Sequence, residues 1–308
     1  MALFFDIEGL PVFEKSVLTI GTFDGVHMGH RTILDEVIRH TKEINGESIV
    51  ITFEPHPRKL LFPDQPIKLI TPLQQKLDLI IRSGIHNVVV APFTKEFSQL
   101  SAEEYVRDFL VKKFNPHSIV IGYDHRFGHD RKGDINLLKE YAATFGYKVY
   151  EIPAQLIDEA AISSTKIRHA LAEGRVADAN HMLGRNYSVS GTVVEGKKLG
   201  RELGYPTANL RHSEPDQILP AIGIYAVKVK WGQNTYKGML SIGQNPTVTD
   251  DKSIKIEVNI FDFDKNIYGD ILEIEFVQRL RDEQKFESLE ALKEQLHLDK
   301  KASLQMLK

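Results

Sequence analysis

The first half of the chain alternates between short continuous apolar runs and longer segments whose apolar residues recur at helical spacing. Continuous runs of strand length are typical of parallel strands that are covered on both faces. The runs lie at residues 16–22, 48–53, 86–93, 117–122 and 148–152. The helical segment after the first run has its apolar face at Ile33, Leu34, Val37 and Ile38. This alternation predicts an α/β doubly wound parallel sheet, with ligands at the carboxyl ends of its strands.

Two helix starts carry capping signals. Thr71 precedes Pro72, and Ser101 precedes Glu104 by three positions. A threonine or serine cap accepts a hydrogen bond from the first turn, proline fits the first helical position, and glutamate can reach back to the cap. We therefore expect helices to begin at both places, the first of them ending at Gly84.

After about residue 160 the pattern changes. Two short helical segments occupy residues 164–174 and 175–183. Short strands, several of them with period-two alternation, then follow at residues 187–195, 224–231, 235–243, 254–261 and 271–277. Such strands, with turns between them and an amphipathic helix at 287–298, predict an antiparallel sheet or β-barrel. We expect two domains: residues 1–184, including a helical linker from about 160, and residues 185–308.

Composition narrows the classes of function. The chain has no cysteine, which excludes disulfides, thiolate metal sites and cysteine nucleophiles. Its net charge of −3 gives no general attraction to nucleic acid or to anionic membranes. No apolar run approaches the ~18 residues that span a bilayer, and the N-terminus lacks the basic start of a signal peptide. We expect a soluble cytoplasmic protein with small-molecule partners; the pattern does not decide between a monomer and a homo-oligomer.

The most specific string is GTFDGVHMGH, residues 21–30, at a predicted strand-to-helix turn. Free backbone N–H groups and the positive helix end make such a turn an anion site. Its candidate phosphate-binding residues are Gly21, Phe23, Asp24, Gly25 and Gly29. His27 and His30 lie on one side of the first helical turn, where their imidazoles can donate hydrogen bonds to a phosphate. A capping turn with two solvated histidines is one alternative, and a zinc pair without an evident third ligand is another.

This string resembles the HxGH motif of the Rossmann-like nucleotidyltransferases, and within that superfamily the prokaryotic-type FAD synthetases. Three later segments resemble the same family in the expected order, at residues 52–58, 122–134 and 162–168. The resemblance implies that the second segment binds flavin, through Asp124, Phe127 and Gly128. His125 departs from the aromatic residue that the family usually has at its position.

The segment at 162–168 resembles the triphosphate segment of that family. Ser163 or Ser164 can cap a helix whose N-terminus would meet the β- and γ-phosphates of ATP, together with Thr165, Lys166 and Arg168. An ordinary capped helix is the alternative for this segment alone. The implied reaction is attack of the FMN phosphate on the α-phosphorus of ATP, with release of pyrophosphate. A phosphate is already ionised at neutral pH, since its second pKa is about 6, so the reaction needs positioning and charge stabilisation rather than a general base.

Residues 196–210, GKKLGRELGYPTANL, combine glycines with basic residues and suit a phosphate-covering loop, with Gly200 and Arg201 as candidate contacts. The PTAN element resembles the riboflavin kinase family. That resemblance implies that Thr207 and Asn209 lie at a magnesium and phosphate site, and oxygen ligands of this kind suit Mg²⁺. A flexible hairpin with solvated lysines is the alternative for the loop alone.

The kinase resemblance aligns Glu257 with a general base, which takes the proton of the riboflavin 5′-hydroxyl as that oxygen attacks the γ-phosphorus. Strand periodicity puts Glu257 and Asn259 on one face. Other acidic residues compete for the role on charge alone: Asp262, Asp264 and Asp270. Further family-like segments give the flavin-binding candidates Tyr225, Asn245, Arg279 and Arg281, although Val248 departs from the usual aromatic residue. The arginines are equally plausible as surface salt-bridge partners.

Together the motifs predict a bifunctional enzyme of FAD biosynthesis. The second domain would phosphorylate riboflavin to FMN, and the first would adenylylate FMN to FAD, with ATP as co-substrate and Mg²⁺ as cofactor. One alternative is that only one activity is functional; another is a flavin-binding regulatory module without turnover. The residues His27, His30, Thr207, Asn209 and Glu257 favour turnover, because binding alone does not need them.

Overall fold

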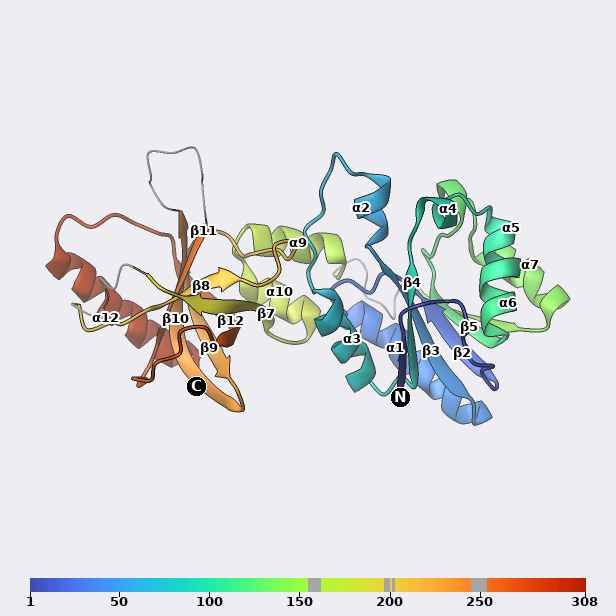
Figure 1. Cartoon of the computed structure of the whole chain (residues 1–308), viewed down its shortest axis with the longest axis horizontal. Coiled ribbons are helices and arrows are strands. Elements are labelled where there is room, and N and C mark those ends of the chain that lie inside the picture. The colour runs from blue at the N-terminus through green and yellow to red at the C-terminus, as the bar shows by residue number, and fades with distance from the viewer. Residues whose placement is uncertain (155–161, 197–199, 201–202, 245–253) are drawn as a thin grey trace. The chain divides into compact units, whose positions relative to one another are not determined.

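The computed structural model describes residues 1–154, 162–196, 200, 203–244 and 254–308 (Figure 1). The chain forms two compact units, Met1–Ser164 and Thr165–Lys308. The helical segment that follows Ser164 therefore belongs to the second unit, whereas the sequence pattern grouped it with the first domain. Within the described ranges, no helix is long and apolar enough to cross a membrane.

The first unit is built on a six-stranded sheet in which every strand pair is parallel. The strand order is β1 (Ala2–Phe4), β4 (Asn87–Pro92), β3 (Glu47–Glu54), β2 (Ser16–Ile20), β5 (Pro116–Gly122) and β6 (Lys148–Ile152). The predicted doubly wound sheet is confirmed. The pattern missed β1, because a three-residue edge strand is too short to give a periodic signal.

Helices cover both faces of this sheet, as continuous apolar strands require. On one face, α1 (Met28–Ile44) and α3 (Leu73–Arg82) pack against Val17, Val50, Val88 and Val120, one valine from each of the four central strands. On the other face lie α7 (Ile135–Phe145) and a helix composed of α5 (Ala102–Glu104), the π-helical η1 (Tyr105–Val111) and α6 (Lys112–Phe114). Among the described residues, this unit also contains the short helices α2 (Pro57–Leu61) and α4 (Lys95–Ser98) and the 3-10 turn η2 (His129–Arg131).

One of the two predicted caps is confirmed and the other is wrong. At α5, the Ser101 hydroxyl accepts from the Glu104 N–H (3.1 Å) and the Glu104 carboxylate accepts from the Ser101 N–H (2.8 Å). At α3, Pro72 holds the cap position and no side-chain cap forms. The Thr71 hydroxyl instead accepts from the Gly25 N–H (3.0 Å). The side chain that the sequence pattern predicted as the helix cap is therefore used in a tertiary contact.

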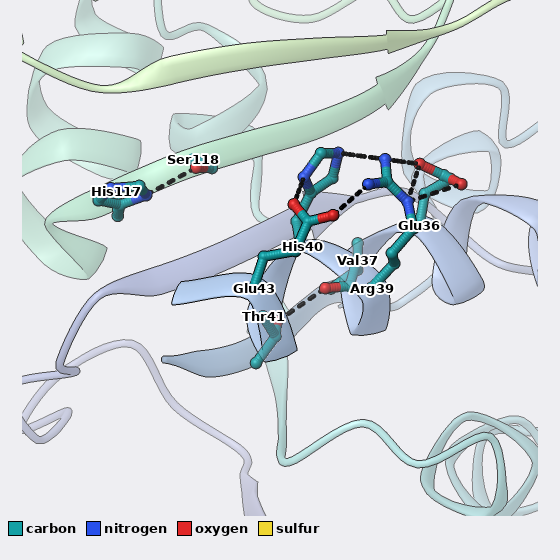
Figure 2. A network of polar contacts seen from close by, with 8 residues as sticks. All are labelled: Glu36, Val37, Arg39, His40, Thr41, Glu43, His117 and Ser118. Atoms are coloured by element: carbon teal, nitrogen blue, oxygen red, sulfur yellow. Dashed lines mark hydrogen bonds and ion pairs between the residues drawn. The ribbon is translucent and has the colours of Figure 1, made fainter. Parts of the chain in front are cut away.

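The C-terminal half of α1 is tied to β6 by an aromatic stack, not by the surface ion pairs that Figure 2 shows around His40. The His40 ring is 7% exposed and stacks on Tyr150 of β6, with 3.6 Å between ring centroids. His40 Nδ1 lies 3.1 Å from Glu43, and Arg39 contacts both Glu36 and Glu43. Exposed helix pairs of this kind contribute little to stability, so the buried ring is the part that orients α1.

The second unit contains a closed antiparallel barrel, as the alternating strands predicted. The order around the barrel is β10 (Asn234–Gln244), β11 (Ile254–Ile260), β8 (Ala208–His212), β7 (Tyr187–Val194), β12 (Ile271–Arg281) and β9 (Gly223–Trp231). The pattern missed β8, whose five residues directly follow a turn-rich loop. Two helices, α9 (Ser164–Ala172) and α10 (Val176–Leu183), precede the barrel, and α12 (Leu289–Met306) follows it.

Polar contacts fix these helices on the barrel. The Asn180 amide of α10 donates to the Phe276 carbonyl of β12 (2.8 Å) and accepts from the Tyr187 N–H of β7 (2.7 Å). Arg281, at the end of β12, contacts the Asp299 carboxylate of α12 through two nitrogens, at 2.9 and 2.7 Å. The Asp299 side chain is only 4% exposed, so this ion pair is largely removed from water.

Arg281→Met should lower the free energy of unfolding of the second unit by about 3 kcal/mol, because the Asp299 carboxylate would stay buried without its cation. Asp299→Asn is the matched control and should cost less, because the amide keeps an acceptor oxygen and carries no charge. Urea unfolding followed by fluorescence reports on this unit alone, since Trp231 of β9 is the single tryptophan of the chain. A loss below about 1 kcal/mol in Arg281→Met would contradict the anchoring role.

Candidate functional site

The string at 21–30 lies at the point where the strand order of the sheet reverses. It follows β2, from which the chain continues to β3 and β4 on one side before it crosses to β5 on the other side of β2. Open α/β sheets bind ligands in the crevice at such a switch point, beyond the carboxyl ends of the strands. The loops after β3 and β5 carry the two other family-like segments of the sheet.

Backbone donors from a distant segment hold this turn. The buried Asp24 carboxylate accepts from the N–H groups of Ile70 and Thr71, each at 3.0 Å. Gly25 has a φ of +88°, which glycine adopts without strain. The Ser164 hydroxyl donates to the Asp24 carbonyl (3.0 Å) and so joins the start of α9 to the turn. The side chain of Asp24 therefore stabilises the turn through backbone contacts.

The turn also contains strained backbone. Phe23 and Val26 have φ values of +49° and +38°, in a region that non-glycine residues rarely adopt and that is least favourable for a β-branched side chain. Both side chains are buried, at 2% and 1% exposure. Strain of this kind persists only where the surroundings over-determine it, and it is frequent at functional sites. Of the other candidate glycines, Gly21 donates to the Ile51 carbonyl (3.0 Å) and Gly29 is buried in the first turn of α1.

The two histidines of the string stack on each other. Their ring centroids are 3.7 Å apart with 17° between the planes, as expected from their spacing. His27 is the N-cap of α1, and its Nδ1 accepts from the His30 N–H (3.3 Å). A neutral His27 imidazole therefore carries its proton on Nε2. Two imidazolium rings at this separation would repel each other, so the stack favours a state with at most one positive charge.

Burial, together with the neighbouring His27 and Lys76, holds the pKa of His30 well below its usual value of 6.5. His30 Nδ1 is buried and has no hydrogen-bond partner among the described residues. The Phe23 ring covers one side of His30, with 5.0 Å between centroids. His30 is therefore a neutral imidazole at physiological pH, with one buried nitrogen available for a hydrogen bond to a ligand.

Sequence reasoning missed Lys76 of α3. Its side chain is buried, and its Nζ donates to the Thr22 carbonyl (3.2 Å) and to the Thr52 hydroxyl (3.0 Å). Burial lowers the pKa of Lys76, while the Glu54 and Asp24 carboxylates raise it. A signal was available in the sequence: Lys76 is three residues after Leu73 and four before Ile80, so it falls on the apolar face of the predicted helix.

The loop after β5 places its candidate residues in different surroundings. Asp124 is exposed. Phe127 is only 5% exposed, because its ring stacks on Tyr105 in the core, 5.1 Å away. Its backbone pairs with Gly133, and Gly128 follows with a contact to α5. The buried ring of Phe127 therefore anchors the loop to the core of the first unit and does not face solvent.

His125 in the same loop is a partly buried histidine whose Nε2 faces the interior. Its Nε2 is buried with no partner among the described residues. Burial lowers its pKa from 6.5 to about 4; Asp124 opposes that shift and Arg131 adds to it. The ring lies 5.9 Å from Phe127. His125 thus takes the place of an aromatic residue as a neutral ring.

In the barrel, the predicted chemistry lies on two adjacent strands. Asn209 of β8 is the direct cross-strand neighbour of Glu257 of β11. Thr207 is exposed just before β8, two residues from Asn209, so both side chains leave the same face of the extended chain. Lys255 forms an ion pair with Glu257 (2.8 Å), and the Glu257 side chain keeps 29% of its surface exposed.

The PTAN loop is fixed by Asn259, a residue for which the sequence indicated a face but no role. Asn259 is 6% exposed, and its amide donates to the Pro206 carbonyl (2.7 Å). The Gly196 backbone approaches the Asn209 side chain so closely that a Cβ at Gly196 would lie 2.0 Å from the Asn209 amide nitrogen. The loop before β8 therefore closes around Asn209, and the Gly200 carbonyl accepts from the Tyr205 N–H (2.8 Å).

The remaining barrel candidates have internal partners. Tyr225 is fully buried and its hydroxyl donates to the Ala221 carbonyl. Arg279 donates to the Ile222 carbonyl (2.7 Å) and pairs with Asp282 (2.9 Å). Arg281 is engaged by α12, as described above. Arg201, Asn245 and Val248 lie outside the described residues.

On α9, Thr165 and Lys166 are exposed, while Arg168 and the preceding Ser163 are half-buried. Among the described residues, no group of three or more His, Cys, Asp or Glu side chains is placed to hold a metal ion. The zinc interpretation of His27 and His30 thus gains no third ligand from that part of the chain. The hydroxyl and amide oxygens of Thr207 and Asn209 are of a different kind, and they suit a hard cation such as Mg²⁺.

Two family models match the chain, one on each side of the helical segment. The FAD synthetase model matches residues 11–166, and the riboflavin kinase model matches residues 183–307. A bifunctional riboflavin kinase/FMN adenylyltransferase from Listeria monocytogenes is 39% identical over 290 residues, which cover 92% of this chain and 90% of the relative. The protein of that description from Escherichia coli K12 is 36% identical over 287 residues, 93% and 91% of the two chains.

A solved structure is similar over both units. The chain from Streptococcus pneumoniae that is described as a macrolide-efflux protein has a TM-score of 0.90 with this chain. The two are 32% identical, and the similarity covers 98% of each chain. The parallel sheet and the barrel thus occur together, in one polypeptide, in a solved relative.

His125→Phe should make stability less dependent on pH. Between pH 6.5 and about 4, the unfolded chain binds a proton at His125 that the folded chain excludes, so this residue makes stability fall as the pH falls. As the pH is lowered through that window, the free energy of unfolding of the variant should rise relative to that of the wild type by up to about 1.4 kcal/mol for each pH unit. Thermal unfolding at about pH 7 and about pH 5 measures the difference, with the exposed His129→Phe as control; equal shifts in both variants would contradict the prediction.

Proposed function

Because this chain belongs to the family of bifunctional riboflavin kinase/FMN adenylyltransferases, we propose that the parallel sheet and the barrel each carry out one of the two reactions. The chain phosphorylates riboflavin to FMN with ATP and adenylylates FMN to FAD with release of pyrophosphate. The observation that carries the division is that each family model lies, nearly in full, on a different unit. The parallel sheet is then the adenylyltransferase, and the barrel is the kinase.

In the adenylyltransferase, an FMN phosphate oxygen attacks the α-phosphorus of ATP, and the bond from that phosphorus to the pyrophosphate oxygen breaks. The nucleophile is already ionised, so no residue needs to take a proton. The Nε2–H of His27 and the neutral His30 donate hydrogen bonds to the charge that develops on the phosphoryl oxygens. The N-terminus of α1, with Gly21, Gly25 and Gly29, receives the phosphates. Stacking supports joint action of the two histidines.

Other residues of the first family model complete this proposal. Ser163, Ser164, Thr165, Lys166 and Arg168 form the segment that holds the β- and γ-phosphates. The contact from Ser164 to the Asp24 carbonyl supports it, since it joins the start of that segment to the histidine-bearing turn. In the flavin loop, the exposed Asp124 contacts the flavin directly, while Phe127 and Gly128 give the loop its shape. Phe23 and Asp24 act by supporting the turn.

In the kinase, Glu257 takes the proton of the riboflavin 5′-hydroxyl while that oxygen attacks the γ-phosphorus, and ADP leaves. Its pairing with Asn209 across two strands supports the assignment, because it joins the base to the PTAN element. Lys255 forms an ion pair with the Glu257 carboxylate and so orients it. Asp262 and Asp264 have no such neighbour on β8.

The oxygens of Thr207 and Asn209 fit Mg²⁺, and we propose that they hold it. A bound Mg²⁺ neutralises phosphate charge during transfer. The chain's own contribution is to fix these two oxygens: Asn259 holds the Pro206 carbonyl, and the Gly196 backbone closes on Asn209. We further propose that the enzyme acts in the cytoplasm on small molecules alone, since both reactions consume ATP.

The two-site assignment predicts opposite losses in two variants. His30→Ala should abolish FAD formation and leave FMN formation from riboflavin unchanged, because its imidazole belongs only to the adenylyltransferase. Glu257→Ala should abolish FMN formation and leave FAD formation from supplied FMN unchanged. Chromatographic analysis of flavin products with ATP and Mg²⁺ measures both. Loss of both activities in either variant would contradict the assignment.

Asn259→Ala should loosen the PTAN loop and impair only the kinase. Removing one net hydrogen bond of about 1 kcal/mol should raise the MgATP concentration that half-saturates riboflavin phosphorylation about fivefold. Asn234→Ala, at an exposed position of β10, is the matched control. An equal effect of Asn259→Ala on FAD formation from FMN would show a general structural fault instead of local positioning.

A further inference from the structure

Lys76 is a buried cation for which the reactions described so far have no use. Its side chain is 5% exposed, on the face of α3 that packs against the sheet. Burying an ammonium group is costly, and lysine is seldom found in protein interiors unless it is paired. A neutral apolar side chain of similar length would fill the position without that cost. The presence of a charged lysine at this buried position therefore indicates a role beyond packing.

The contacts of Lys76 converge on one carbonyl of the histidine-bearing turn. Its Nζ donates to the Thr22 carbonyl (3.2 Å), and the Thr52 hydroxyl donates to the same carbonyl (3.1 Å). Lys76 also donates to the Thr52 hydroxyl (3.0 Å), so the three groups form a closed triangle. Thr22 directly precedes Phe23, the first residue of the turn with a positive φ. The triangle therefore holds the backbone at the point where the strained turn begins.

The charged and titratable groups around Lys76 define its electrostatic surroundings. From the turn and from β3, the carboxylates of Asp24 and Glu54 face it, and from the start of α1 the His30 ring does. His27 is the remaining group that acts on His30. The carboxylate of Asp24 is already engaged by backbone N–H groups. The ammonium group is thus a fixed positive charge beneath the histidine pair.

We propose that Lys76 is a positioning residue for adenylyl transfer: it fixes the histidine-bearing turn through the Thr22 carbonyl and supplies a fixed positive charge beneath it. The proposal rests on the assignment of this turn to the adenylyltransferase. Lys76 does not contact substrate, since its ammonium is buried against protein acceptors. It acts by holding His27 and His30 in place and by making the turn more attractive to the triphosphate and to the charge that develops during transfer.

Lys76→Met removes the charge and keeps the length of the side chain. The Thr22 carbonyl retains its bond from Thr52, so the urea midpoint should not fall and riboflavin phosphorylation should not change. The turnover of FMN to FAD should fall at least ~10-fold, as expected when a preorganised positive charge is lost from a phosphoryl-transfer site. Retention of FAD formation within about twofold of wild type would overturn the proposal.

A second measurement separates charge from packing. Imidazole resonances of histidine-labelled protein should show that His30 titrates at a higher pH in Lys76→Met than in wild type, because a neighbouring positive charge has been removed. Thr52→Val is the matched control: it breaks the triangle and keeps the ammonium, so the His30 titration should stay in place and FAD formation should fall less than ~3-fold. Equal losses of FAD formation in the two variants, or an unmoved His30 titration in Lys76→Met, would overturn the role of the charge.

His30→Ala distinguishes this inference from the assignment on which it rests. If His30→Ala still forms FAD, the assignment of the turn itself fails, and Lys76 loses its context. If His30→Ala is inactive while Lys76→Met is fully active, only the role of Lys76 is overturned. The kinase activity of the same preparations reports that the barrel is folded, and urea unfolding followed by far-ultraviolet circular dichroism reports on the first unit as well.

Discussion

The hydrogen bonds from the Ile70 and Thr71 backbone to the Asp24 carboxylate connect the parts of the first unit that matter for chemistry. They join the turn after β2 to the residues that directly precede α3. The same contact therefore fixes the shape of the turn and the point at which α3 begins. Because Lys76 lies in the first turns of α3, its ammonium reaches the Thr22 carbonyl only when this join is made. The turn after β2, the start of α3 and the Lys76 ammonium therefore depend on one another for their positions.

The barrel uses the same principle with different groups. Asn259, on β11 of the barrel, donates a hydrogen bond to the backbone of the segment that carries Thr207 and Asn209. In both units, a loop next to the residues proposed for chemistry is fixed by a buried polar side chain of a neighbouring regular element. Precise positioning of this kind depends on the supporting groups as much as on the reacting ones. Neither support is the residue that a motif would single out.

The sequence predicted the fold and the family, because hydrophobic periodicity and short motifs depend only on residues that are close together in the chain. Hydrophobic periodicity indicated the parallel sheet and the barrel, and the cap formed by Ser101 and Glu104 is purely local. Prediction from local sequence failed where a side chain forms its hydrogen bond with a residue that is distant in the chain. Thr71 accepts a hydrogen bond from Gly25 instead of capping its own helix. Local patterns do not contain such contacts, because the partners meet only when the sheet has formed.

The position of α10 has a consequence for how the two activities could be separated. Its Asn180 amide satisfies backbone groups of both β7 and β12, and Val176, Ala179 and Leu183 are fully buried. A barrel excised at the boundary that the strand pattern indicates would lose this cover, expose an apolar patch and leave two strands with unpaired backbone groups. Gene fission, or the exchange of one module between related enzymes, would therefore need a junction that leaves α10 with the barrel.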